Sequence, residues 1–168
     1  MPNDVIFPPT AFTSKYSTLA NKLINRARII ANGKYIEGDV QWDTGAEGTC
    51  VSHEVVKTLG LIPIGKIKVI TPSGDKNVDR YMAEVLLPNN VLVKDVIVND
   101  SEIGSQGIIA LIGMDIIQLG DFSVSNFNNK TFFSFRIPSK KHVNYVDDIH
   151  LEQRIGKRHG KGKKKKRK

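Results

Sequence analysis

Apolar and polar residues alternate with a period of two along much of the chain, a pattern that predicts half-buried β-strands. The alternation is clearest over residues 34–42, and the apolar segment 23–31 lies just before it. The dipeptide Asn32-Gly33 joins the two segments. Type I′ hairpin turns favour this dipeptide, because both of their central positions need a positive φ. The pattern therefore predicts a β-hairpin whose second strand ends just before Asp43.

The rest of the chain predicts further short strands with two short helices between them. Ser52 has N-cap chemistry for a helix that ends at Leu59, with Gly60 in the position that closes helices. A second short helix is expected over Met114–Leu119. Regular spacing of the strands predicts an all-β domain, mostly antiparallel and shaped like a closed barrel. The remaining predicted strands cover residues 50–52, 66–71, 76–87, 91–98, 108–112, 122–126 and 131–137.

Both ends of the chain differ in composition from its centre. Residues 1–18 contain three prolines and several Ser and Thr, and we interpret them as an extended N-terminal arm. Residues 19–138 are the predicted domain, and residues 139–168 are a predicted disordered tail. Ten of the 25 Lys and Arg residues lie in 154–168, which has no acidic residue. Residues 1–153 therefore hold 15 basic against 17 acidic side chains, so the basicity belongs to the tail.

Composition excludes several classes of protein. A single cysteine excludes an internal disulfide framework and a Cys-rich zinc site. The four histidines show no metal-ligand spacing, so neither a metal nor an organic cofactor is expected. The N-terminus lacks the pattern of a signal peptide, and no apolar run approaches the ~18 residues of a membrane span. We therefore expect a cytoplasmic protein without a membrane span.

The stretch with the clearest chemical content is Asp43-Thr44-Gly45-Ala46, directly after a predicted strand. Glycine lets the backbone turn sharply there, which leaves the Asp43 carboxylate at the end of the strand, anchored and in contact with water. A second stretch, residues 110–117, has an apolar run, a glycine and the start of a short helix. Together the two stretches resemble the retropepsin-like (retroviral-type) aspartic proteases, closer to the bacterial and cellular single-domain relatives, and the similarity covers most of residues 23–137.

The resemblance implies a role for each matched residue. Asp43 is the expected catalytic acid of a peptidase that activates water with two carboxylates sharing one proton. Because the chain has one Asp-Thr-Gly, a homodimer must supply the second carboxylate. Thr44 would bind the opposite loop, while Gly45 and Ala46 line the cleft over a peptide or protein substrate. The expected flap tip is Pro72-Ser73-Gly74-Asp75, and Ile112-Gly113 is the strand expected behind the catalytic loop.

The sequence also departs from the family. Many retroviral members have an Asp after the Ala and an Arg after the distal Gly, and these two residues pair. Here Glu47 and Met114 stand at those positions, so the ion pair is absent and substrate subsites do not transfer. Of the other nearby acids, Asp115 suits the start of a helix, and neither it nor Asp121 precedes a Thr-Gly or Ser-Gly.

Other interpretations remain open at this point. Cys50 and His53 lie three residues apart, which suits a thiol protease, but no orienting residue accompanies them. The fold could instead serve as a catalytically silent dimeric module that binds peptides, localised by the basic tail. It could also be a dimerising domain of a nucleic-acid-associated protein. Three interpretations of the tail, residues 154–168, remain. It is a solvated end of the chain, a non-specific tether to nucleic acid or to an anionic surface, or a localisation signal that another protein binds.

Overall fold

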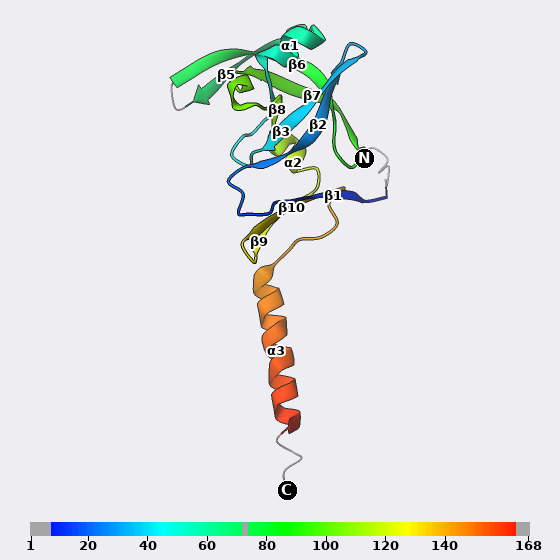
Figure 1. Cartoon of the computed structure of the whole chain (residues 1–168), viewed down its shortest axis with the longest axis vertical. Coiled ribbons are helices and arrows are strands. Elements are labelled where there is room, and N and C mark those ends of the chain that lie inside the picture. The colour runs from blue at the N-terminus through cyan, green and yellow to red at the C-terminus, as the bar shows by residue number, and fades with distance from the viewer. Residues whose placement is uncertain (1–7, 72–73, 164–168) are drawn as a thin grey trace.

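The computed structural model describes residues 8–71 and 74–163, and these form two β-sheets with helices between and after the strands (Figure 1). The strands are β1 (Thr10–Lys15), β2 (Leu23–Ala31), β3 (Lys34–Trp42), β4 (Cys50–Ser52), β5 (Gly65–Thr71), β6 (Gly74–Leu86), β7 (Leu92–Ser101), β8 (Ala110–Ile112), β9 (Asp121–Phe127) and β10 (Lys130–Ile137). The helices are α1 (His53–Leu59), the 3-10 turn η1 (Gly104–Gln106), α2 (Met114–Ile117) and α3 (Tyr145–Lys163). The mostly β architecture with short helices is confirmed, with α3 as the exception in length.

The two sheets differ in size and in pairing. The smaller sheet has strand order β1-β10-β9, all antiparallel. The larger sheet has order β2-β3-β8-β4-β7-β6-β5, and β2 also pairs with β6 through residues 28–30. The larger sheet is mixed, because β3 pairs in parallel with β8 and β4 pairs in parallel with β7.

Local signals in the sequence set the first hairpin and the first helix. β2 and β3 pair from Leu23↔Trp42 to Ala31↔Lys34, and both turn residues, Asn32 and Gly33, have positive φ as the type I′ signal requires. In α1, the Ser52 hydroxyl accepts a hydrogen bond from the backbone N–H of Val55 at 3.4 Å. Gly60 ends the helix with φ of 63°. These elements match their predicted positions.

Long-range pairing shifts other boundaries. Strand β7 continues to Ser101 instead of ending at Val98, because Asn99, Asp100 and Ser101 pair with the short strand β4. The connection from β7 to β8 contains η1. Strand β8 begins at Ala110, later than the apolar run suggests.

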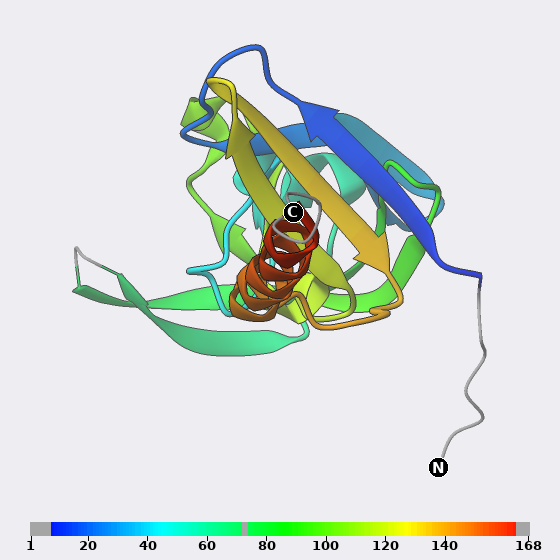
Figure 2. The ribbon, with the colours of Figure 1, turned by 90° about the horizontal axis from the view of Figure 1, so that it is seen from below.

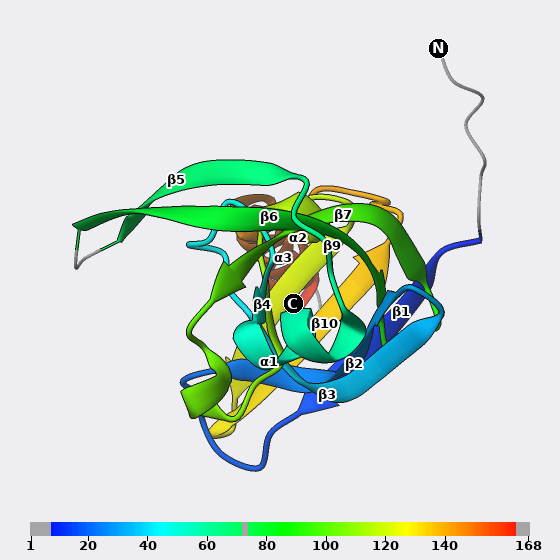
Figure 3. The same cartoon turned by 90° about the horizontal axis from the view of Figure 1, so that it is seen from above.

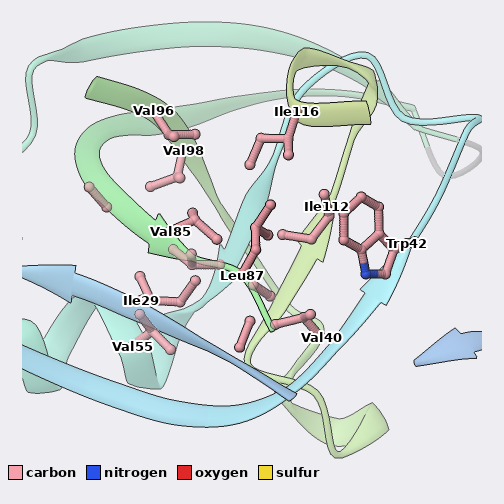
Figure 4. Close-up of a cluster of buried hydrophobic side chains, with 14 of the residues drawn as sticks. Ile29, Val40, Trp42, Val55, Val85, Leu87, Val96, Val98, Ile112 and Ile116 are labelled. Atoms are coloured by element: carbon pink, nitrogen blue, oxygen red, sulfur yellow. The ribbon is translucent and has the colours of Figure 1, made fainter. Parts of the chain in front are cut away.

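A buried apolar core fills the space enclosed by the larger sheet (Figure 4). Ile29, Val40, Val85, Val98 and Ile112 are among its fully buried residues, drawn from strands that are far apart in the sequence. Because these side chains come from alternate positions of their strands, the period-two pattern of the sequence is the origin of this core.

Aromatic rings join the smaller sheet to the larger one. Trp42, at the end of β3, lies with its ring centroid 4.9 Å from that of Phe135 and 5.3 Å from that of Phe133. Phe12 packs edge-on against Phe133 at 5.5 Å. Because Phe12 lies in β1, part of the predicted N-terminal arm (residues 1–18) is a strand of the chain's own sheet, beside β10 (Figure 2).

The C-terminal segment also differs from its prediction as a disordered tail. Residues 145–163 form α3, which extends away from the sheets (Figure 1). Asn144 stabilises its start: the side-chain oxygen accepts from the N–H of Val146 at 3.1 Å, and the amide donates to Asp147 at 2.7 Å. Acidic residues in the first turn also favour the helix dipole. Within residues 8–71 and 74–163, no helix is both long and apolar enough to cross a membrane.

One carboxylate ties the end of the smaller sheet to the segment that leads toward α3. Asp121 accepts hydrogen bonds from the Ser139 hydroxyl, the backbone N–H of Lys140 and the Arg136 guanidinium. These bonds, that of Ser139 first, hold the pKa of the Asp121 carboxyl well below its usual range. The ionised form is therefore the one that stabilises this junction.

We expect Asp121→Asn to lower the free energy of unfolding by about 2 kcal/mol at neutral pH, since it removes a charged acceptor. A depressed folded-state pKa contributes stability that is complete above the unfolded pKa of about 3.9 and is lost as the pH falls through the folded pKa. Urea denaturation of both proteins should thus give a gap at pH 7 that narrows below about pH 4. A gap that does not change with pH would contradict this role.

Candidate active site

The segment after β3 is a tight loop held mainly by its own backbone. The N–H of Asp43 donates to the carbonyl of Ile112 at 3.0 Å, which continues the parallel pairing of β3 with β8. Asp43 Oδ1 accepts from the N–H of Gly45 at 2.8 Å, and the Ala46 N–H donates to the Asp43 carbonyl at 3.2 Å. Asp43 is half-buried and Thr44 is exposed. The loop thus fixes one carboxylate oxygen and leaves the group accessible to water.

The segment that follows β8 packs against this loop. The N–H of Met114 donates to the Ala46 carbonyl at 2.8 Å, and the N–H of Asp115 donates to the Glu47 carbonyl at 3.1 Å. Gly113 lies so close that a Cβ on it would stand 2.5 Å from the carbonyl carbon of Gly48. Glycine is therefore required by close backbone approach, since the φ of Gly113 is an ordinary −94°.

A buried threonine locks the two segments together, and the sequence did not single it out. Thr49 is fully buried. Its N–H and hydroxyl donate to the two carboxylate oxygens of Asp115 at 3.0 and 2.8 Å, and the hydroxyl accepts from the Gly113 N–H at 3.2 Å. Asp115 also accepts from the N–H of Ile116. The interpretation of Asp115 as a helix-start carboxylate agrees with these bonds. The sequence held one indication of a role for Thr49: it is a polar residue directly before an apolar strand.

The thiol-protease alternative finds no support in the geometry. His53 Nδ1 lies 3.0 Å from Asp100 Oδ2, on the exposed surface. Burial raises the pKa of the Cys50 thiol above its usual value, which opposes formation of the thiolate nucleophile. The partly buried Cys50 is therefore better suited to packing than to nucleophilic attack.

A groove with a volume of about 1550 Å³ runs beside the loop. Residues 45–48 line one side of it, with Ile116 and Leu119 next to them. The opposite wall includes Ile67 and Val78 of the β5–β6 hairpin and Ile97 of β7. Figure 3 shows this hairpin reaching away from the body of the fold.

Asp43 itself opens onto a different, smaller depression. This depression has a volume of about 310 Å³, and its lining includes Asp43, Thr44, Trp42 and two residues of β9, Phe122 and Val124. In a single copy of the chain the predicted catalytic side chain therefore lines this depression, whereas residues 45–48 of its loop line the large groove.

The predicted flap tip is only partly described. Pro72 and Ser73 lie outside the described residues. Gly74 and Asp75, which were predicted to be in the turn, instead begin β6 and pair with Thr71 and Ile70. Strand pairing in this hairpin thus reaches Thr71 and Gly74. Lys68 and Asp75 form an ion pair at 2.6 Å across the two strands.

Comparisons with known proteins place the chain near one group of structures. No protein-family model matches the chain, and no curated protein sequence matches it. Among solved structures, it is similar to a retropepsin-like aspartic protease from Rickettsia conorii, at 14% identity and a TM-score of 0.49, over 77% of this chain and 96% of that one.

Two viral proteases are also similar. For the simian foamy virus (mac) protease, identity is 22% and the TM-score 0.42, over 55% of this chain and 89% of that one. For the EIAV protease in complex with the inhibitor HBY-793, identity is 16% and the TM-score 0.46, over 60% and 88%. These neighbours are retropepsin-like aspartic proteases, the family that the sequence resembles. At such identities and TM-scores, the similarity establishes no activity for this chain.

Proposed function

We propose that the chain is an aspartic endopeptidase that hydrolyses peptide bonds with a water molecule activated by the Asp43 carboxylates of a homodimer. The observation that carries this proposal is the state of Asp43. One oxygen is fixed by the N–H of Gly45 at 2.8 Å, and the side chain is only half-buried. A carboxylate that is both oriented and wet can take a proton from water.

A single carboxylate cannot serve as base and acid at once, whereas two that share a proton can. The other acidic residues considered for this role are engaged elsewhere. Asp115 holds Thr49, and Asp121 holds Arg136 and Ser139. The second carboxylate therefore comes from another copy of the chain. The exposed Thr44 beside Asp43 would bind the loop of that partner.

The groove gives the substrate its place. An extended peptide between the loop and the β5–β6 hairpin would meet backbone groups and apolar walls, the usual way in which strands recognise peptides. Ile67, Val78 and Ile97 line the hairpin side, so apolar substrate side chains are favoured. In this proposal the hairpin acts as a flap that covers the peptide, and no metal or organic cofactor takes part.

The proposal can be tested because the proposed activity requires two copies of the chain. We expect kcat/KM per chain, measured on a library-derived fluorogenic peptide, to rise with protein concentration and to level off as the dimer forms. Sedimentation velocity over the same concentrations should give a matching midpoint. Cleavage by a species that sediments as a monomer would contradict the paired site. A dimer that binds library peptides without cutting them would instead support the silent peptide-binding module.

A further inference from the structure

Arg80 lies on the strand at the centre of the groove wall that faces the loop after β3. In the larger sheet, β6 lies between β7 and β5 (Figure 3). Arg80 is paired with Asn99 of β7 on one side and with Gly65 of β5 on the other. Directly opposite residues of antiparallel strands share a face, so the side chains of Arg80 and Asn99 project from the same face of the sheet. Because Gly65 has no side chain, β5 adds nothing beside Arg80 at this position.

This face of the sheet is turned toward the groove. Nδ2 of Asn99 lies 3.8 Å from the point where a Cβ on Gly48 would stand, and Gly48 belongs to the loop that lines the groove. Ile67 and Val78 pair with each other two residues further along the hairpin, share the face and also line the groove. Arg80 and Asn99 are lining residues as well. A guanidinium and an amide therefore stand next to each other on a wall with apolar neighbours.

The fold itself supplies no partner for either polar group. Arg80 is half-buried, and no carboxylate of residues 8–71 and 74–163 forms an ion pair with it. Its neighbour Asp79 faces the other side of the hairpin, where it pairs with Lys66 at 3.7 Å. In the same described part of the chain, Oδ1 of Asn99 is buried without a hydrogen-bond partner. A charge that is partly withdrawn from water is costly without a partner, so a bound carboxylate would stabilise this wall.

We propose that Arg80, with Asn99 beside it, selects substrate peptides that carry a glutamate or aspartate side chain. The inference rests on the proposed function, because it assigns an occupant to the same groove. A guanidinium donates two parallel hydrogen bonds to a carboxylate, a geometry that an ammonium group does not provide. The amide of Asn99 donates a further hydrogen bond from Nδ2. Ile67 and Val78 nearby favour apolar side chains at other positions of the peptide.

A preference for basic side chains suits this groove less well. Among the described acidic residues that line it, all but Glu47 and Asp95 are already bound by groups of the chain itself. Both of these residues are exposed, so water solvates their carboxylates. An exposed charge gains little from an ion pair, whereas the half-buried Arg80 gains more from a ligand of opposite charge.

The test measures peptide binding separately from cleavage. The full chain carrying Asp43→Asn is immobilised, and a library of short peptides randomised at every position is passed over it. Mass spectrometry then compares the retained peptides with the input. We expect Glu and Asp to be enriched about tenfold over Gln and Asn at one or more positions, because a hydrogen bond between charged groups is stronger than one between neutral groups.

Substitutions in the same Asp43→Asn chain assign the preference to Arg80. Arg80→Gln should lose the enrichment, Arg80→Lys should keep part of it, and Arg80→Glu should enrich Lys and Arg instead. The matched control is Lys66→Gln, which removes one positive charge from the opposite face of the same hairpin and should leave the enrichment unchanged. Retention of no peptide, enrichment of Lys and Arg by the Asp43→Asn chain, or an unchanged preference in Arg80→Gln would each overturn the proposal.

The two proposals fail in different ways. An unmodified chain that binds acidic peptides but does not cut them would contradict the proposed protease and support this inference. A chain that cleaves library peptides with no preference for Glu or Asp would contradict this inference and leave the protease intact.

Discussion

We expect replacement of Asp43 by Asn to abolish the proposed peptide cleavage, with a fall in kcat/KM of about 10²- to 10⁴-fold, the usual contribution of a positioned proton-transfer group. The amide is nearly the same shape, and its oxygen can still accept from the Gly45 N–H that now holds Oδ1 at 2.8 Å. The loop should therefore keep its conformation. In the proposed dimer the substitution would remove the shared proton, because neither copy would then have a carboxylate to give or take it.

The control for this substitution lies on β3, the strand that leads into the loop. Asp39 is half-exposed and forms only a long ion pair, 3.8 Å, with Arg26. Asp39→Asn should leave kcat/KM unchanged. That result would show that the loss of one charge on β3 does not by itself reduce cleavage. Sedimentation should also show that the Asp43→Asn chain still dimerises. A variant at Asp43 that cleaves as fast as the original chain excludes this residue from the chemistry.

We expect the second large effect, on both stability and cleavage, from adding one methyl group at Gly113. The Cβ of Gly113→Ala would stand 2.5 Å from the carbonyl carbon of Gly48 and 3.0 Å from the carbonyl oxygen of Ala46. These are backbone atoms, so the conflict cannot be relieved by a side-chain rotation. We expect the free energy of unfolding to fall by about 3 kcal/mol, the upper range for overpacking. Moving the loop by about 1 Å should also reduce kcat/KM by about 10²-fold.

Gly65→Ala is the matched substitution. A Cβ at Gly65 meets nothing within 4 Å, and its φ is not positive, so stability and cleavage should stay close to those of the unmodified chain. Urea denaturation measures the first quantity and initial rates on a fluorogenic peptide measure the second. If Gly113→Ala behaved like Gly65→Ala in both measurements, the close approach of Gly113 to the loop would matter neither for stability nor for cleavage.

Features that depend on neighbouring residues were predicted from the sequence. The positive φ of Asn32 and Gly33 and the cap of α1 by Ser52 each involve residues within a few positions of one another. The chemical content of Asp43-Thr44-Gly45 is equally local, since one strand end and one glycine suffice to present a carboxylate. Asp43 remains a catalytic residue by proposal, because its expected partner is another copy of the chain.

Contacts between distant residues explain what the sequence did not predict. Thr49 is a hydrogen-bonding partner of Asp115, 66 positions away, and nothing near either residue indicates the pairing. Strand β1 is recognisable only through its pairing with β10, and Phe12 only through Phe133. For the C-terminal segment, charge density suggested disorder, whereas the cap by Asn144 and the acidic first turn favour the helix over residues 145–163.

By itself, the sequence determined the local conformations: which residues turn, cap and alternate, and which carboxylate follows a strand. The resemblance led us to expect Ile112-Gly113 behind the loop of Asp43, but only the tertiary structure decided that β8 pairs between β3 and β4 and that Gly113 lies too close to the loop backbone for a Cβ. The physical reason is that turns and caps are stabilised within a few residues, whereas the order of strands depends on burying apolar faces that meet only when the whole chain has folded.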